Sequence, residues 1–181
     1  FRLNRGEFVF EDTRYFGRMT LAADVIDKLG PEPLSEGFNG EVLFEALSNC
    51  RQAIKPKLLD QTLLAGVGNI YASEALWHAR ISPRKIARRL TRVHCEALAV
   101  SVVKVLTEAI NQGSTIPLDF PGEKDGDGLF YYGSNDAQQG YEERLMVYDR
   151  EGGPCERCGA LIRKIVQAAR STYFCPKCQR G

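Results

Sequence analysis

The chain has 181 residues, of which 44% are hydrophobic, which is enough for one or two modest domains with real cores. Its formal net charge is only +1, and six cysteines are few for a disulfide scaffold of this length. No apolar run approaches membrane-spanning length and no signal peptide is visible, so we expect no membrane partner. Because the cysteines do not suggest a disulfide scaffold, we expect a reducing compartment.

The N-terminal residues alternate in the manner of a β-strand, with Phe8 and Phe10 on one face. Two strands do not form a stable sheet alone, so we expect residues 1–30 to be the tail of an incomplete N-terminal β-sandwich. Because the chain begins at Phe1 rather than Met, we expect it to be processed or truncated. The Gly-Pro-Glu-Pro-Leu run at 30–34 predicts a linker.

Helical periodicity dominates from about residue 39 to residue 112. The pattern predicts helical segments around 43–50, over 56–64, from 70 to about 82, and over 91–112. The last of these is expected to bury seven apolar residues: Val93, Leu98, Val102, Val105, Leu106, Ala109 and Ile110. Cys50 and Cys95 fall within helical patterns and are expected to be free thiols in the core.

A long aperiodic stretch follows at residues 114–140 and contains seven glycines or prolines. A loop of this length is either functional or mobile. Strand-like alternation resumes over 141–148 and leads into the C-terminal segment.

Four cysteines in that segment form two pairs, Cys155 with Cys158 and Cys175 with Cys178, separated by sixteen residues. This spacing is typical of a tetrahedral zinc site made by four thiolates on a β-ribbon. The spacing alone leaves open a structural zinc without any partner, or two disulfides. The residues between the pairs carry cations and hydroxyls but no acid, so a rigid hairpin there would present an arginine to a phosphate.

Charge is unevenly distributed along the chain. Residues 80–92 contain six cations and no acid, and residues 144–181 contain eight cations and three acids. Residues 119–143 instead contain seven acids and a single lysine. A charge run is usually a solvated face, but two basic blocks on separate elements can also form one stripe that binds a polyanion.

The segment Gly66-Val67-Gly68-Asn69 lies between two predicted helices, and Lys55 and Lys57 open the first. Glycines allow a sharp turn, and free N–H groups at the next helix start can hold a phosphate, with Asn69 as a further donor. By itself, the segment is more simply interpreted as a tight helix–helix turn.

Three separated motifs carry a more specific resemblance. Residues 54–61 and 65–74, residues 169–179, and the Asp-Thr-Arg-Tyr-Phe-Gly-Arg run at 12–18 closely resemble the formamidopyrimidine-DNA glycosylase and endonuclease VIII family, in the family's own order. The resemblance implies an α+β protein, mainly a helical helix–two-turn–helix domain with a C-terminal β-ribbon zinc finger. The expected division is a β-sandwich tail at 1–30, a DNA-binding domain at 38–140 with a lesion-recognition loop at 114–140, and the zinc finger at 141–181.

The resemblance also implies site residues. Lys55, Asn69 and Arg170 match positions that hold the phosphates around a lesion, and Gly68 shapes the turn between them. Arg14 and Phe16 match residues that fill the space left by an everted nucleotide, where an inserted side chain compensates for lost stacking. One structural zinc on Cys155, Cys158, Cys175 and Cys178 is implied.

Members of this family use an N-terminal proline as the nucleophile, with an adjacent glutamate and a lysine further on. This chain begins with Phe1 and Arg2 and has none of these three residues, so we expect no catalytic residue in it. The resemblance implies the DNA-binding portion of a bifunctional DNA glycosylase and AP lyase of base-excision repair. Such an enzyme removes oxidised purines (8-oxoguanine, formamidopyrimidines) and nicks the abasic strand by β-elimination.

Two alternatives stay open at this point: a non-catalytic module that binds damaged DNA on the same scaffold, and a zinc-ribbon interaction protein unconnected with DNA. The expected partner is double-stranded damaged DNA, bound by a monomer. The expected location is the cytoplasm of a bacterial-type cell, at the nucleoid.

Overall fold

The computed structural model describes residues 2–7, 9–10, 19–20, 24, 26–111 and 145–180, and all structural statements refer to these. The elements are β1 (Arg2–Leu3), β2 (Gly6–Glu7), α1 (Gly40–Leu47), α2 (Ile54–Leu58), α3 (Asn69–His78), the 3-10 helix η2 (Ala87–Arg89), α4 (Arg92–Asn111), β3 (Arg163–Gln167) and β4 (Arg170–Phe174). The strands form two antiparallel hairpins, β1–β2 and β3–β4. The observed class is therefore α+β and mainly helical, as predicted.

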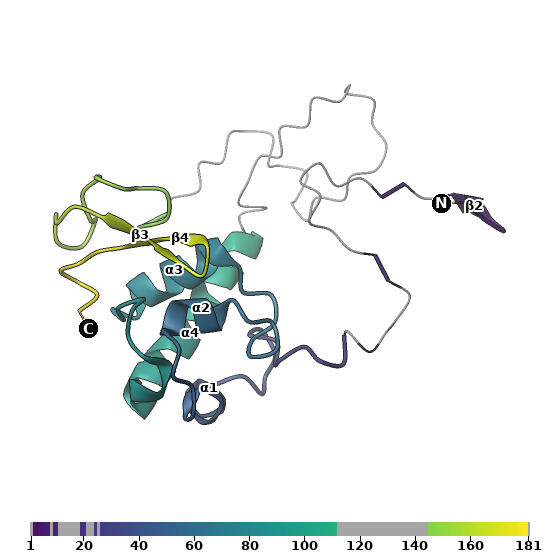
Figure 1. Cartoon of the computed structure of the whole chain (residues 1–181), viewed down its shortest axis with the longest axis horizontal. Helices are drawn as coiled ribbons and strands as arrows, with labels where there is room; N and C mark the ends of the chain where they lie inside the picture. The colour runs from purple at the N-terminus through teal and green to yellow at the C-terminus, as the bar shows by residue number, and fades with distance from the viewer. Residues whose placement is uncertain are drawn as a thin grey trace, which may run out of the picture.

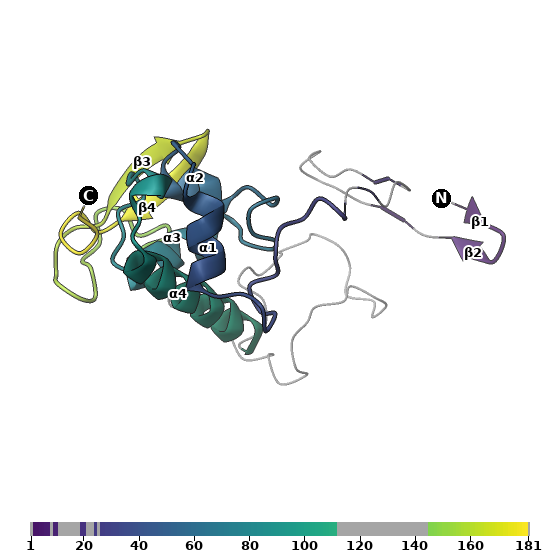
Figure 2. The same ribbon diagram turned by 90° about the horizontal axis from the view of Figure 1, so that it is seen from below.

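The helices surround one apolar core in which α4 packs against both α1 and α3 (Figures 1 and 2). Fully buried side chains from all four helices meet there, among them Leu43, Leu58, Leu76 and Leu98. A second, smaller core lies under the C-terminal hairpin and joins Trp77 of α3 to Val147, Ile162 and Tyr173. Because Trp77 belongs to α3, this second core packs the C-terminal hairpin directly against the helices.

The helix predicted over 56–64 is shorter than expected and ends at Leu58. Asp60 is the reason, because its carboxylate accepts hydrogen bonds from the Thr62 backbone N–H at 3.0 Å and the Thr62 hydroxyl at 2.7 Å. Such a local turn competes with helix continuation. The helix beginning at Asn69 also ends early, at His78, because Arg80 adopts a left-handed conformation and Ile81 N–H bonds to Leu76 O in a Schellman cap.

Two further predictions were wrong: the burial of two residues of α4, and the strand over 141–148 within its described part. Val93 and Ile110 of α4 are exposed, at 79% and 60%, because α4 turns other faces toward α1 and α3. The stretch 30–34 forms neither helix nor strand, and it is packed against the helical region: Gly30 N–H donates to Gln61 O at 2.8 Å, and a Cβ on Gly30 would meet the Leu63 carbonyl carbon at 2.5 Å. Residues 145–148 form a turn rather than the strand predicted over 141–148.

At the N-terminal end, the described residues include the two-residue strands β1 and β2, and most of the predicted alternation lies outside the described residues. None of the helices in the described ranges combines the length and apolarity that a bilayer crossing requires.

Candidate metal centre and nucleic-acid interface

The four predicted cysteines converge at the base of the β3–β4 hairpin. Their Sγ atoms all lie within 4.8 Å of one another, with Cys155–Cys178 at 4.0 Å and Cys158–Cys175 at 3.5 Å. Tetrahedral zinc with bonds of about 2.3 Å requires sulfur atoms about 3.8 Å apart, whereas a disulfide requires about 2.05 Å. All four are free thiols, as are Cys50 and the buried Cys95, so the disulfide alternative is wrong and the set fits one structural zinc.

Buried groups around the cysteines hold the ligands in place. Trp77 Nε1–H points to Cys155 Sγ at 3.4 Å, and Cys178 N–H points to Cys175 Sγ at 3.4 Å. The buried Gln179 accepts the Cys175 N–H at 2.8 Å and donates to Ile81 O at 3.0 Å. Donors to thiolate sulfur and partners of the ligand backbone orient a metal site, and here they also bind it to α3 and the segment after it.

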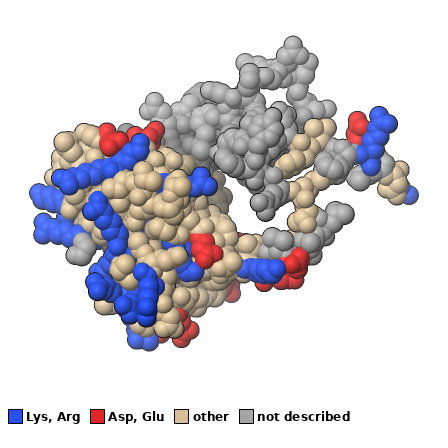
Figure 3. Space-filling view, viewed as in Figure 1, with Lys and Arg blue, Asp and Glu red and all other residues tan. Residues whose placement is uncertain are grey.

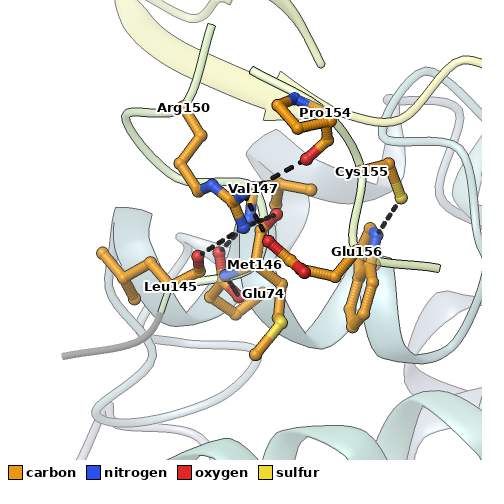
Figure 4. A network of polar contacts seen from close by, with 9 residues as sticks. Glu74, Leu145, Met146, Val147, Arg150, Pro154, Cys155 and Glu156 are labelled. Carbon is orange, nitrogen blue, oxygen red and sulfur yellow. Dashed lines mark hydrogen bonds and ion pairs between the residues drawn. The ribbon is translucent and has the colours of Figure 1, made fainter. Parts of the chain in front are cut away.

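Glu74 makes a connection that sequence reasoning missed. Glu74 is only 4% exposed, and its carboxylate accepts the backbone N–H groups of Met146 and Val147 at 2.8 and 2.9 Å (Figure 4) and that of Tyr148 at 2.8 Å. Burial raises the pKa of Glu74, and the three N–H bonds oppose that rise. The carboxylate thereby attaches the segment that leads into the zinc ribbon to the middle of α3.

Arg150 completes this network from the other side. Its guanidinium donates to the carbonyl oxygens of Leu145, Met146 and Pro154 and pairs with Glu156 at 2.6 Å (Figure 4). The turn is thus held by Glu74 through its N–H groups and by Arg150 through its carbonyl groups.

The glycine turn before α3 is held by a side chain of the preceding segment. Gln61 accepts the Gly66 N–H at 2.8 Å and donates to Val67 O at 3.1 Å. Gly66 has a φ of +76°, a conformation that favours glycine. Gly68 is the exposed N-cap of α3, and no side chain caps the first N–H groups of the helix.

Lys55, Asn69 and the C-terminal hairpin meet at one point, which we call the Lys55 junction (Lys55, Asn69, Arg170 and Ser171). Lys55 Nζ donates to Asn69 Oδ1 and, at 3.4 Å, to Ser171 O, and Asn69 Nδ2 donates to the same carbonyl oxygen at 3.1 Å. Figure 1 shows the β3–β4 hairpin lying over α2 and α3 at this point. Three elements far apart in sequence therefore place the predicted residues together.

The charge at the Lys55 junction is unbalanced. Lys55 is fully buried, and both of its hydrogen-bond acceptors are neutral. Burial, followed by repulsion from Arg170, lowers the pKa of Lys55 to about 8. Since a buried cation without an anionic partner is costly, the arrangement indicates a negative ligand that completes it.

Arg170 is exposed at the start of β4, directly after a two-residue turn formed by Ala168 and Ala169. Both alanines have positive φ, 47° and 57°, which is the geometry of a type I′ hairpin turn. The turn is placed by Gln167, whose Nε2 donates to Pro83 O at 3.2 Å. The arginine is thus presented at the tip of a short ribbon whose other end is the metal centre.

Some predicted site residues lie outside the described residues. Arg14, Phe16 and the loop at 114–140 are among them, so their expected roles remain predictions.

The helical region and the zinc ribbon each match a known protein family. Residues 29–119 match the family described as "Formamidopyrimidine-DNA glycosylase H2TH domain", and residues 152–181 match "Zinc finger found in FPG and IleRS". The chain belongs to the formamidopyrimidine-DNA glycosylase family. The first matched region contains Lys55 and Asn69 of the Lys55 junction. The second contains Arg170 and Ser171 of the same junction, together with the four cysteines of the metal centre.

Curated relatives named formamidopyrimidine-DNA glycosylase cover almost all of the chain. The protein from Desulfitobacterium hafniense is 41% identical over 98% of this chain and 64% of its own length. The one from Chloroflexus aurantiacus is 46% identical over 97% of this chain and 61% of its own length. The chain thus spans less than two thirds of these glycosylases.

Solved structures of the family share the fold. The Thermus thermophilus protein superposes with a TM-score of 0.70 at 40% identity, covering 86% of this chain and 55% of that one. A MutM protein in complex with DNA containing carbocyclic 8-oxo-G gives 0.70 at 39% identity, covering 87% and 53%. Lactococcus lactis Fpg with abasic-site DNA gives 0.70 at 39%, covering 87% and 54%.

Proposed function

We propose that this chain is the DNA-binding portion of a base-excision-repair glycosylase and AP lyase that acts on oxidised purines. The observation that carries the proposal is the fully buried Lys55, whose described partners are all neutral, beside Arg170 and the start of α3. We propose that Lys55, Gly68, Asn69 and Arg170 hold phosphates of the strand that contains the lesion.

Each group at the Lys55 junction suits a phosphate for a separate reason. An ammonium and a guanidinium supply charge, and hydrogen bonds to a charged acceptor are stronger than neutral ones. The uncapped N–H groups after Gly68 add donors at the positive end of the α3 dipole. A phosphate placed there would also relieve the desolvation that lowers the pKa of Lys55.

The lesion class rests on the relatives. Solved family members were obtained with DNA containing 8-oxo-G, Fapy-dG or an abasic site, and we propose the same substrates for the protein to which this chain corresponds. The zinc would have no chemical role: four cysteines fill its coordination shell and hold the hairpin that presents Arg170.

DNA binding by the 181-residue chain tests this proposal directly. Asn69→Ala and Arg170→Ala should each weaken binding to a duplex carrying an abasic-site analogue by about 1–3 kcal/mol, which is about 5- to 150-fold. Lys104→Ala is the matched control, because Lys104 pairs with Glu108 on α4 and is expected to leave the affinity unchanged. Wild-type affinity in both test variants would contradict the proposal.

The chemistry requires an amine placed at the sugar C1′ carbon, which the family takes from an N-terminal proline. We propose that the 181-residue chain, which has Phe1 and Arg2 instead, forms no borohydride-trapped adduct with 8-oxoguanine DNA. A trapped adduct as abundant as that of a full-length family member would show that catalysis resides in residues of this chain.

A further inference from the structure

A basic pocket opens beside the zinc ribbon, away from the tip that carries Arg170. Its volume is about 520 Å³, and it lies between the segment after α3 and the base of the β3–β4 hairpin. Five cations line it: Arg84, Lys85 and Arg89 from the first wall, and Arg163 and Arg180 from the second. We call it the basic pocket and define it by these five residues.

The basic pocket has no negative counterpart among the described residues. None of its five cations belongs to the ion pairs found in the described ranges. Arg84 instead lies over the Phe174 ring at 5.2 Å, and Lys85 Nζ lies 3.5 Å from His94 Nε2. Five cations around one hollow repel one another, so an anion that enters it is stabilised by all of them.

The two basic blocks of the sequence meet here. Arg84, Lys85 and Arg89 come from the block at 80–92, and Arg163 and Arg180 come from the C-terminal block. Lys and Arg side chains gather along the left side of the face in Figure 3, with few acidic groups among them. Five cations from the two blocks thus line one pocket, which favours the alternative that the blocks act together over two separate solvated faces.

The basic pocket is joined to the Lys55 junction by the backbone. Ile54 N–H donates to Lys85 O at 2.8 Å and Lys55 N–H to Pro83 O at 3.4 Å, so the segment that carries the pocket cations pairs with the start of α2. Gln167 braces the same segment from the hairpin through Pro83 O. The segments that carry the two positive sites are thus held together by hydrogen bonds.

We propose that the basic pocket is a second phosphate-binding site, which takes backbone phosphates of the duplex outside the lesion site. This inference rests on the proposed function, because it assumes that the Lys55 junction holds DNA. From Arg170 to Phe174, β4 advances four residues, about 13 Å at the rise of a strand. That length corresponds to about four base pairs of duplex.

Duplex DNA is favoured over an acidic protein segment for two reasons. The segment that carries three of the five cations is hydrogen-bonded to the start of α2, which contains the proposed phosphate-binding Lys55. Phe174, which also lines the pocket, is only 6% exposed and offers little apolar contact to a peptide. A phosphate backbone needs only the cations that line the basic pocket.

The test compares two lesion-analogue duplexes. The short one extends only about two base pairs to either side of the lesion and is closed by loops with uncharged methylphosphonate linkages, and the long one has about 25 base pairs. The variant Arg84→Ala/Lys85→Ala/Arg89→Ala should lose at least tenfold in affinity for the long duplex and less than twofold for the short one. On the long duplex, its log–log salt slope should become shallower by about two, since each phosphate that the protein no longer neutralises changes the slope by about 0.9. The variant Arg163→Ala/Arg180→Ala removes the two cations of the opposite wall, so it tests the pocket even if the triple variant does not fold. Lys104→Ala is the control.

Equal losses on both duplexes, or no loss on the long one, would overturn the inference. If the triple variant binds both duplexes normally but loses binding to a labelled oligoglutamate peptide, the pocket takes acidic protein instead, which also overturns it. Failure of the unsubstituted chain to bind either duplex would contradict the proposed function itself.

Discussion

Lys55 Nζ and the carbonyl oxygen of Ser171 lie 3.4 Å apart although 116 positions separate them in the chain. The contact joins a lysine of α2, in the helical domain, to β4 of the zinc ribbon. Asn69 lies between them and bonds to both. The phosphate site that we propose here depends on the correct packing of two regions, to which the cysteine cluster and Glu74 contribute.

Glu74 should contribute strongly to stability. Glu74→Ala leaves three backbone N–H groups, one buried and two part-buried, without their acceptor, so we expect a loss of at least about 2 kcal/mol in the free energy of unfolding. Urea denaturation of the zinc-loaded protein measures it. The exposed Glu45→Ala on α1 should change stability by less than about 0.5 kcal/mol. Similar stabilities for the two variants would mean that the turn at 146–148 is held by other contacts.

Zinc analysis should give one equivalent for each chain. Cys50→Ser/Cys95→Ser should keep that value, whereas Cys158→Ser should reduce both zinc content and DNA affinity, because the hairpin carrying Arg170 loses its fixed base. Burial raises the pKa of Cys95 to about 11, so this thiol should react slowly with thiol reagents in the folded protein. Less than half an equivalent of zinc in reduced protein would contradict the assignment.

The hairpin turn carries strain that a glycine should remove. Ala169 has φ of 57°, a conformation that disfavours residues with a Cβ. Ala169→Gly should therefore stabilise the ribbon by about 0.5–1 kcal/mol after the entropy of the unfolded glycine is subtracted. Thermal unfolding measures the change, and DNA affinity should be unaffected. A destabilised variant would show that the turn does not have the I′ geometry.

Much of this arrangement could be predicted from sequence because it depends on local spacing. Cysteine pairs two residues apart fix a knuckle, and the Gly66–Asn69 run fixes a turn, whatever surrounds them. The resemblance to the family then placed Lys55 and Arg170 at one site, which periodicity alone could not do.

The errors arose where tertiary contacts decide the outcome. Val93 matches the apolar period of α4 but lies on the side that neither α1 nor α3 covers. Glu74 has the sequence appearance of an ordinary acidic helix residue, since its partners begin 72 positions later. Asp60 ended a helix that propensity would have continued, through a turn that only its side-chain bonds to Thr62 reveal.

The lowered pKa of Lys55 predicts two effects of pH with opposite sign. Between about 8 and 10.5 the unfolded chain holds this proton and the folded chain does not, so the contribution of Lys55 to folding stability rises with pH. Phosphate binding requires the charged form, so DNA affinity should fall as pH rises above about 8. Measurement of DNA affinity between about pH 7 and pH 9.5 checks this. In the Lys55→Met variant, the part of the decrease in affinity that comes from deprotonation of Lys55 should be absent. An equal decrease in Lys55→Met would assign it to another group.

Lys55→Met tests the central claim most directly, because it separates the fold from the function. A buried lysine retained for a phosphate weakens the folded state, so its replacement by an apolar side chain of similar length should raise the free energy of unfolding by about 1–3 kcal/mol. The same variant should bind lesion-analogue DNA at least tenfold more weakly, with a salt slope shallower by about 0.9. A less stable variant that binds DNA with unchanged affinity would contradict the account.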